Sequence, residues 1–204
     1  MISNKIDNSL VGNVKIPGDK SISHRSIIIP SISRGICKIS NLLESEDVLC
    51  TINAFKEMGV KIEKNSDNVI IYGNGLKSLK KPNKDLYMGN SGTSARLLTG
   101  LLSTQDFETT ITGDKSLSSR PMKRIANPLI AMNANIRTNN GYLPLTIAGK
   151  IPPIPCFSFI LAKNHCSHFL IEYCRINLGT NFSAKRPKRS RTKNARFRGV
   201  VTLK

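Results

Sequence analysis

Two short stretches of this chain combine cations, hydroxyls and a glycine in the pattern G-D-K-S-x-S-x-R. The first covers residues 18–25 and the second covers residues 113–120. Lysine and arginine side chains that converge with serine hydroxyls suit the binding of phosphate and carboxylate groups. One such cluster is typical of a solvated loop, but two near-copies within 204 residues favour a functional role. The pattern is therefore consistent with a binding site for a small phosphorylated anion.

A third stretch, Gly89-Asn-Ser-Gly-Thr-Ser-Ala-Arg96, brings glycines and hydroxyls to the start of a predicted helix. The free N–H groups and the positive dipole end of a helix N-terminus favour anions. A helix that begins near Lys20 would present the same features beside the first motif. Glycine also serves strand-to-helix turns for backbone reasons, and this loop taken alone leaves both interpretations open.

Hydrophobic spacing predicts that strands and helices alternate along the first three quarters of the chain. We predict helices over residues 20–33, 46–58, 93–103 and 121–132. We predict strands over residues 10–17, 36–40, 60–64, 68–72, 86–88, 108–112, 134–138 and 143–148. Ser45 and Ser119 are the candidate N-caps, the latter before Pro121 at the first helical position, and Gly59 is a candidate C-terminal glycine.

The predicted elements repeat along the chain. Three residue pairs are each 74 positions apart: Met58 and Met132, Ile62 and Ile136, Asn65 and Asn139. A period of this length indicates a supersecondary unit, here strand–helix–strand–helix–strand–strand. Each unit has one apolar sheet face and helices to bury, so the copies should pack around a shared helical core.

The three motifs, residues 17–25, 89–96 and 113–122, together resemble the N-terminal part of the 5-enolpyruvylshikimate-3-phosphate synthase family over about residues 5–150. The resemblance implies an α+β fold of two domains, each with three βαβαββ repeats around a helical core, of which this chain would hold about two of six. It implies transfer of the enolpyruvyl group from phosphoenolpyruvate to the 5-hydroxyl of shikimate-3-phosphate. That step belongs to the shikimate pathway of chorismate and aromatic amino acid biosynthesis.

The resemblance also assigns site residues. Lys20 would be catalytic, because it would lie between the two substrates and neutralise developing charge. It assigns the shikimate-3-phosphate contacts to Lys20, Ser21 and Arg25. It assigns the phosphoenolpyruvate contacts to Lys20, Asn90, Gly92 and Arg120. We interpret three further residues as structural, packed or surface residues, namely His24, Arg96 and Lys115. We expect the carboxylates of Glu46 and Asp47 to stabilise a helix N-terminus.

The implied reaction needs no metal and no cofactor, and the histidines and cysteines form no convincing ligand set. The related UDP-N-acetylglucosamine enolpyruvyl transferases are an alternative within the same fold. For that family we expect Lys-Asn where Lys20-Ser21 stands, so Ser21 favours the shikimate enzyme. A second alternative is a half-site that binds a phosphorylated anion without turnover.

The net charge of +18 is unevenly distributed. Residues 1–150 carry 20 Lys and Arg and 12 Asp and Glu. Residues 151–204 carry 11 Lys and Arg but only one acidic residue. We therefore divide the chain into a partial N-terminal domain, 1–150, and a divergent basic tail, 151–204. We hypothesise that the tail is an out-of-frame translation, disordered, and that the chain is an inactive fragment. The rival hypothesis is a basic arm that binds nucleic acid through residues 185–198.

The remaining composition narrows the setting of the protein. The N-terminal residues lack the apolar core of a secretory signal, and no apolar run reaches the ~20 residues of a membrane span. The chain has five cysteines, an odd number, and no secretory signal, so we expect reduced thiols and not a disulfide framework. We expect a cytoplasmic monomer whose partners are its two small-molecule substrates, with no membrane and no nucleic-acid partner.

Overall fold

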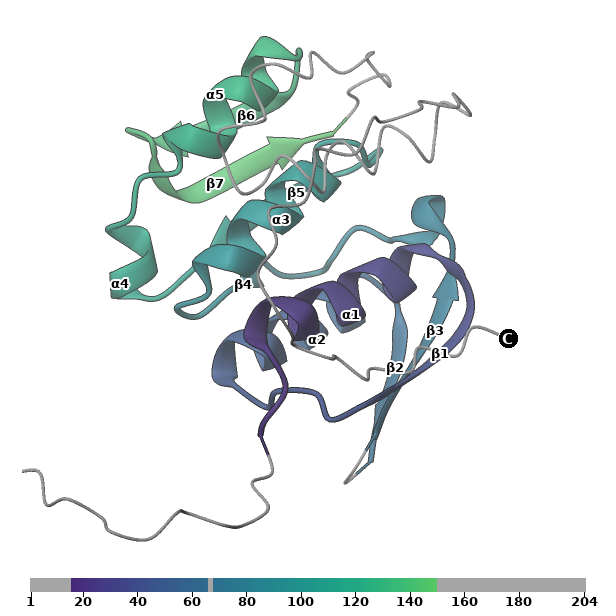
Figure 1. Cartoon of the computed structure of the whole chain (residues 1–204). Helices are drawn as coiled ribbons and strands as arrows, with labels where there is room; N and C mark the ends of the chain where they lie inside the picture. Colours follow the sequence, from purple (N-terminus) through teal and green to yellow (C-terminus); the bar gives the residue numbers. More distant parts are fainter. Residues whose placement is uncertain (1–15, 66–67, 150–204) are drawn as a thin grey trace, which may run out of the picture.

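The computed structural model describes residues 16–65 and 68–149 as a mixture of helices and sheets (Figure 1). The helices are α1 (Lys20–Ile32), α2 (Glu46–Glu57), α3 (Gly92–Leu102), α4 (Lys115–Ser118), α5 (Lys123–Ala131) and the short 3₁₀ turn η1 (Leu76–Ser78). The strands are β1 (Arg34–Ser40), β2 (Lys61–Lys64), β3 (Asn68–Asn74), β4 (Leu86–Tyr87), β5 (Glu108–Thr112), β6 (Asn135–Asn139) and β7 (Tyr142–Ala148). None of the described helices has the length and apolar content needed to cross a membrane.

The strands form two sheets whose antiparallel parts have the same order. The first sheet runs β1-β3-β2 and the second runs β4-β5-β7-β6, with β4 parallel to β5. The 74-residue offset in the sequence joins equivalent positions, because Met58 and Met132 are the C-caps of α2 and α5. Ile62 and Ile136 are likewise the buried second residues of β2 and β6. The structure therefore places two of the three predicted residue pairs at equivalent positions.

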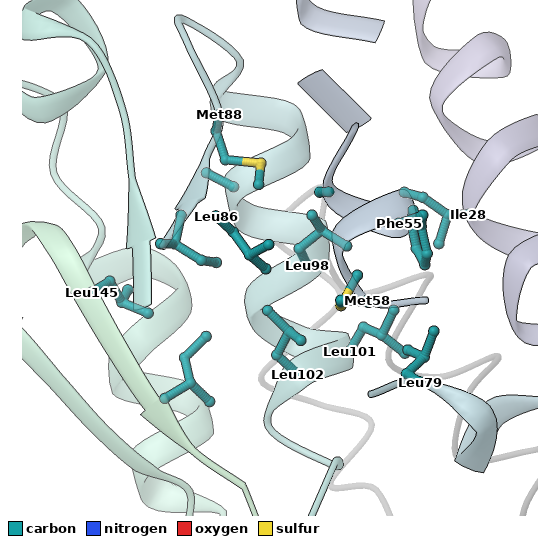
Figure 2. Packing of buried hydrophobic residues seen from close by; sticks show 14 of the residues in the cluster. Ile28, Phe55, Met58, Leu79, Leu86, Met88, Leu98, Leu101, Leu102 and Leu145 are labelled. Atoms are coloured by element: carbon teal, nitrogen blue, oxygen red, sulfur yellow. The ribbon is translucent and has the colours of Figure 1, made fainter. Parts of the chain in front are cut away.

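The helices of the two halves meet between the sheets, and α3 lies at the centre (Figure 1). Its apolar side chains separate two groups of buried residues, one from the second sheet and the segment after β4, the other from α1 and α2 (Figure 2). In the centre are Leu98, Leu101 and Leu102, on one side Leu86, Met88 and Leu145, and on the other Ile28, Phe55 and Met58. One continuous core therefore fixes the N-terminus of α3 relative to α1 and α2.

The two G-D-K-S motifs fold locally in the same way. The side chain of Asp19 accepts a hydrogen bond from the Ile22 N–H (2.7 Å), and that of Asp114 accepts one from the Leu117 N–H (2.6 Å). The aspartate of each motif is therefore an N-cap that starts a helix at the following lysine. A Cβ atom at Gly18 would collide with the carbonyl oxygen of Asn41, so the first motif needs glycine there.

The predicted helices and strands are largely confirmed, with two corrections at helix starts. Helix α5 begins at Lys123 after Met122, and Ser119 is the C-cap of α4, so the predicted cap before Pro121 is wrong. Ser45 occupies the N-cap position of α2 but its side chain makes no capping hydrogen bond. The predictions for most of strand 10–17 and for the tail, 151–204, lie outside the described residues.

Truncation of Leu98 should test the central position of α3. Leu98→Ala should lower the free energy of unfolding by about 2–5 kcal/mol, because it leaves a cavity in a site with no exposed side-chain surface. Urea denaturation provides the measurement, with Ile29→Ala on the exposed face of α1 as the control, expected to cost less than about 1 kcal/mol. Equal losses for both variants would contradict the described core.

Candidate functional site

Three helices begin at one cavity of about 440 Å³. Lys20, Glu46 and Gly92 are the first residues of α1, α2 and α3, and all three line this cavity. The full lining consists of Lys20, Ser45, Glu46, Asp47, Asn90, Gly92, Thr93, Arg96 and Arg120. The first N–H groups of a helix have no partner within the helix and carry the positive end of its dipole. The converging helix starts therefore make the cavity suitable for an anion.

The charged side chains of the lining have both signs. Lys20, Arg96 and Arg120 supply three cations, whereas Glu46 and Asp47 supply two carboxylates. Lys20 forms an ion pair with Asp47, and the lysine side chain is 51% exposed against 16% for the aspartate. The carboxylate thus already neutralises one cation of the cavity, and an incoming anion would have to compete with it for Lys20.

The guanidinium group of Arg120 is held over the start of α3. Its Nη2 atom donates to the side-chain oxygen of Asn90 (2.5 Å) and to the hydroxyl of Ser116 (3.2 Å). A Cβ atom at Gly92 would lie 3.2 Å from Arg96 Nη1 and 3.4 Å from Arg120 Nη1. Glycine at this position therefore leaves room for both guanidinium groups beside the backbone. The Gly92 N–H itself donates to the backbone carbonyl of Asn90 (3.0 Å).

The structure brings together four of the six residues that the sequence assigns to the site. At the cavity lie Lys20, Asn90, Gly92 and Arg120. Ser21 and Arg25 are exposed on the first two turns of α1 and do not belong to the cavity lining. Lys115, the lysine of the second motif, is exposed and also lies outside the lining, as the sequence predicts.

Five lining residues were not assigned to the site from the sequence: Ser45, Glu46, Asp47, Thr93 and Arg96. Arg96 had a usable signal, because it stands four residues after Gly92 and such residues lie on one helix face. The structure places Arg96, which the sequence analysis interprets as a structural or surface residue, in the cavity lining. Asp47 gave no comparable signal, because its partner Lys20 is distant in sequence and only the packing of α1 on α2 joins them.

His24 is fully buried directly below the cavity-lining turn of α1, as expected for a packed histidine. Its Nδ1 atom lies 2.9 Å from the Thr51 hydroxyl of α2. Burial lowers the pKa of His24 below its usual 6.5. The Asp47 carboxylate opposes this shift in pKa, whereas the positive charges of Lys20 and Arg25 add to it. The imidazole is therefore kept neutral at physiological pH.

Comparison with known proteins identifies relatives over most of the described part. Residues 5–159 match the family model of EPSP synthase (3-phosphoshikimate 1-carboxyvinyltransferase). Curated proteins named 3-phosphoshikimate 1-carboxyvinyltransferase are similar to the chain: that of Ruthia magnifica is 59% identical over 145 residues, and that of Oceanobacillus iheyensis 56% over 146 residues. Each alignment covers 71% of this chain. A solved EPSP synthase from Acinetobacter baumannii matches with a TM-score of 0.66 and 51% identity.

The shared region is a minor part of these relatives. It covers 33% of the Ruthia magnifica protein and 34% of the Oceanobacillus iheyensis protein. In the solved Acinetobacter baumannii structure it covers 32% of that chain and 68% of this one. The chain thus spans about a third of the length of the curated relatives that it matches.

Removal of the Asp47 carboxylate should strengthen anion binding. Asp47→Asn releases Lys20 and removes a negative charge from the cavity, so the affinity for inorganic phosphate should rise about threefold to tenfold. Titration with phosphate, followed by amide chemical shifts, measures the change. Glu57→Gln, at the last position of α2, is the matched control and should leave the affinity unchanged. A weaker phosphate affinity in Asp47→Asn would contradict the competition.

Buried neutral His24 should make stability depend on pH. Because its folded-state pKa is lowered, the unfolded chain binds more protons as the pH falls below about 6.5. The stabilisation is therefore fully present above the unfolded pKa and is lost as the pH falls towards the folded value. Urea denaturation between about pH 7.5 and pH 5 should show a smaller loss for His24→Asn than for the unaltered chain. Parallel losses in both proteins would contradict this effect.

Proposed function

Because the chain belongs to the EPSP synthase (3-phosphoshikimate 1-carboxyvinyltransferase) family, we propose that its cavity binds phosphoenolpyruvate beside shikimate-3-phosphate for enolpyruvyl transfer. One observation carries the proposal: three helix N-termini and the cations Lys20, Arg96 and Arg120 meet at a single cavity. Both substrates are multiply anionic, and convergent cations with helix N–H groups are the chemistry that recognises them.

We assign phosphoenolpyruvate to the side of the cavity formed by α3 and Arg120. The guanidinium of Arg120 is oriented by Asn90 and can form paired hydrogen bonds with a carboxylate or phosphate. The Gly92 N–H would contribute a further donor once it exchanges its present acceptor, the Asn90 carbonyl, for a ligand oxygen. Arg96, on the same face of α3, would add positive charge at the same place.

We assign shikimate-3-phosphate to the start of α1. Ser21 and Arg25 are exposed there, four residues apart and hence on one face of the helix, where a hydroxyl and a guanidinium could hold an anionic substrate. Lys20 lines the cavity beside them and would lie between the two substrates. This geometry supports the role of Lys20 in neutralising charge that develops on the transferred group.

The transfer proceeds by addition and elimination. The 5-hydroxyl oxygen attacks C2 of phosphoenolpyruvate and loses its proton while C3 gains one, which gives a tetrahedral adduct. Phosphate then leaves C2 as C3 gives up a proton, which restores the double bond. Electrostatic stabilisation by Lys20 and the arginines fits this sequence, and an acid and a base must complete it. In the family, a second domain supplies these acid–base groups, so we propose that this chain provides the binding half.

The division of the chain follows from the same proposal. We propose that residues 1–150 correspond to two of the six βαβαββ units of the family and that residues 151–204 form a divergent tail. The matching order of the two antiparallel sheets supports two equivalent units. The second unit also carries β4 parallel to β5. We propose that the chain acts as a monomer.

The two motif lysines provide a matched test of the function. Lys20→Ala should weaken phosphoenolpyruvate binding at least about tenfold, because it removes a cation from the cavity lining. Lys115→Ala changes the same residue type in the second motif, outside the lining, and should bind as the unaltered chain does. Isothermal titration of the full chain gives both affinities. Equal loss in both variants, or loss in neither, would refute the proposed site.

A further inference from the structure

We propose that a buried cluster of His24, Thr51, Ser91 and Ser94 positions the three helix starts around the cavity and thereby sets its affinity for anions. The proposal rests on the function proposed above in one respect, namely that the ligand of the cavity is an anion. The four residues touch no ligand in this scheme and act as positioning residues. They act through the backbone turns that carry the cavity lining.

The cluster joins three helices by side-chain contacts. Thr51 on α2 is its centre, with its hydroxyl 2.9 Å from His24 Nδ1 on α1 and 2.6 Å from the Ser94 hydroxyl on α3. The Ser94 hydroxyl also lies 3.4 Å from His24 Nδ1, which closes a triangle. Ser91, the N-cap of α3, lies 2.6 Å from Ser94 through its hydroxyl and accepts the Ser94 backbone N–H.

Each helix places its cluster residue beside its cavity residue. His24 stands four positions after Lys20, and Thr51 stands four positions after Asp47, so each pair shares a helix face. The Thr51 hydroxyl is also within reach of the Asp47 backbone carbonyl, 3.2 Å away. On α3 the cluster residue is even nearer to the lining residue in sequence, because Ser94 and Gly92 both lie in the first turn of the helix. A displacement at the cluster would therefore move the cavity lining.

Because the cluster is completely buried, its polar atoms have no water as an alternative partner. His24, Thr51, Ser91 and Ser94 all have no exposed side-chain surface. A buried hydroxyl or ring nitrogen that loses its partner cannot turn to water, so each polar atom favours the one helix arrangement that keeps its contacts. An apolar contact between the same helices would tolerate sliding, because dispersion is not directional. The cluster is thus suited to fix register and not merely to bury surface.

The neutral state of His24 fits this role. A neutral imidazole can accept at Nδ1 from the Thr51 hydroxyl or donate to it, whereas Nε2 has no hydrogen-bond partner among the described residues. The charged groups that act on the ring are Lys20 and Arg25 on its own helix and Asp47 on α2, and α3 presents the Ser94 hydroxyl. The two neighbouring cations and the burial both oppose a second ring proton.

Substitution of Thr51 separates positioning from simple packing. Thr51→Val keeps the shape of the side chain and removes the hydroxyl, whereas Thr51→Ser keeps the hydroxyl and removes a methyl group. In the full chain, Thr51→Val should bind inorganic phosphate about tenfold more weakly, and Thr51→Ser should bind within about twofold of the unaltered chain. If Thr51 acted by packing alone, Thr51→Ser would weaken phosphate binding more than Thr51→Val, because only the serine variant loses a methyl group.

A second readout does not depend on any ligand. The amides of Ser23, Leu49 and Ala95 donate hydrogen bonds in the first turns of α1, α2 and α3. Without phosphate, Thr51→Val should exchange these three amide protons at least about fivefold faster, and Thr51→Ser should not. The ring ¹⁵N shifts of His24 should change in Thr51→Val, because Nδ1 loses its hydroxyl neighbour.

Thr109 provides the control for the substitution itself. It is buried on β5, and its hydroxyl has no hydrogen-bond partner within the described part of the chain. Thr109→Val should change neither the phosphate affinity nor the exchange of the three amides. Ser94→Ala breaks the same cluster from α3 and replaces Thr51→Val if that variant does not fold.

The two readouts distinguish the failure of each proposal. If Thr51→Val leaves the exchange of the three amides unchanged, or if Thr51→Ser fails to restore it, the positioning role is overturned. If the unaltered chain does not bind phosphate while Thr51→Val still accelerates exchange, positioning stands and the proposed anion function fails. If exchange accelerates but phosphate affinity stays constant, the cluster does not control the cavity and the proposal is overturned.

Discussion

The convergence of three helix N-termini on one small volume is the constraint on which this structure depends. Each start brings N–H groups that have no partner within the helix and a positive partial charge, so the three starts repel one another. Charges of opposite sign offset this repulsion, because Glu46 and Asp47 lie in the first turn of α2 at the cavity. Buried contacts between Thr51, Ser94 and His24 hold the same turns together from below. An anion in the cavity would offset the repulsion further.

This arrangement accounts for the two carboxylates in the lining of the proposed anion site. Without them, Lys20 and the arginines of the lining would add to the positive helix ends. The Lys20–Asp47 ion pair keeps the cavity close to electrostatic balance and keeps the lysine in place for a ligand. Binding of the proposed anion would then exchange one carboxylate partner of Lys20 for another anion. Such exchange favours ligands whose charge is concentrated enough to compete, such as phosphate esters.

Local signals in the sequence were sufficient for most of the described helices and strands, and the resemblance of the motifs to a family located four of the nine residues that line the cavity. Helix and strand periodicity placed the elements, and the G-D-K-S motifs located Lys20 and Arg120. The start of α5 was mispredicted, because Ser119 and Pro121 satisfy the rules for a cap while the chain forms the separate turn α4 first. The roles of Asp47 and His24 depend on how α1 packs against α2. Such contacts between distant segments leave no periodic trace in one sequence.

A titration of the ¹⁵N-labelled chain with phosphoenolpyruvate tests the central claim most directly. If the three helix starts form one anion site, the largest amide shifts should appear together at Lys20, Glu46, Gly92 and Thr93 and should saturate with a single affinity. These residues lie on three helices that only the fold brings together at the cavity. Shifts confined to one helix start, or centred elsewhere in the chain, would contradict the account.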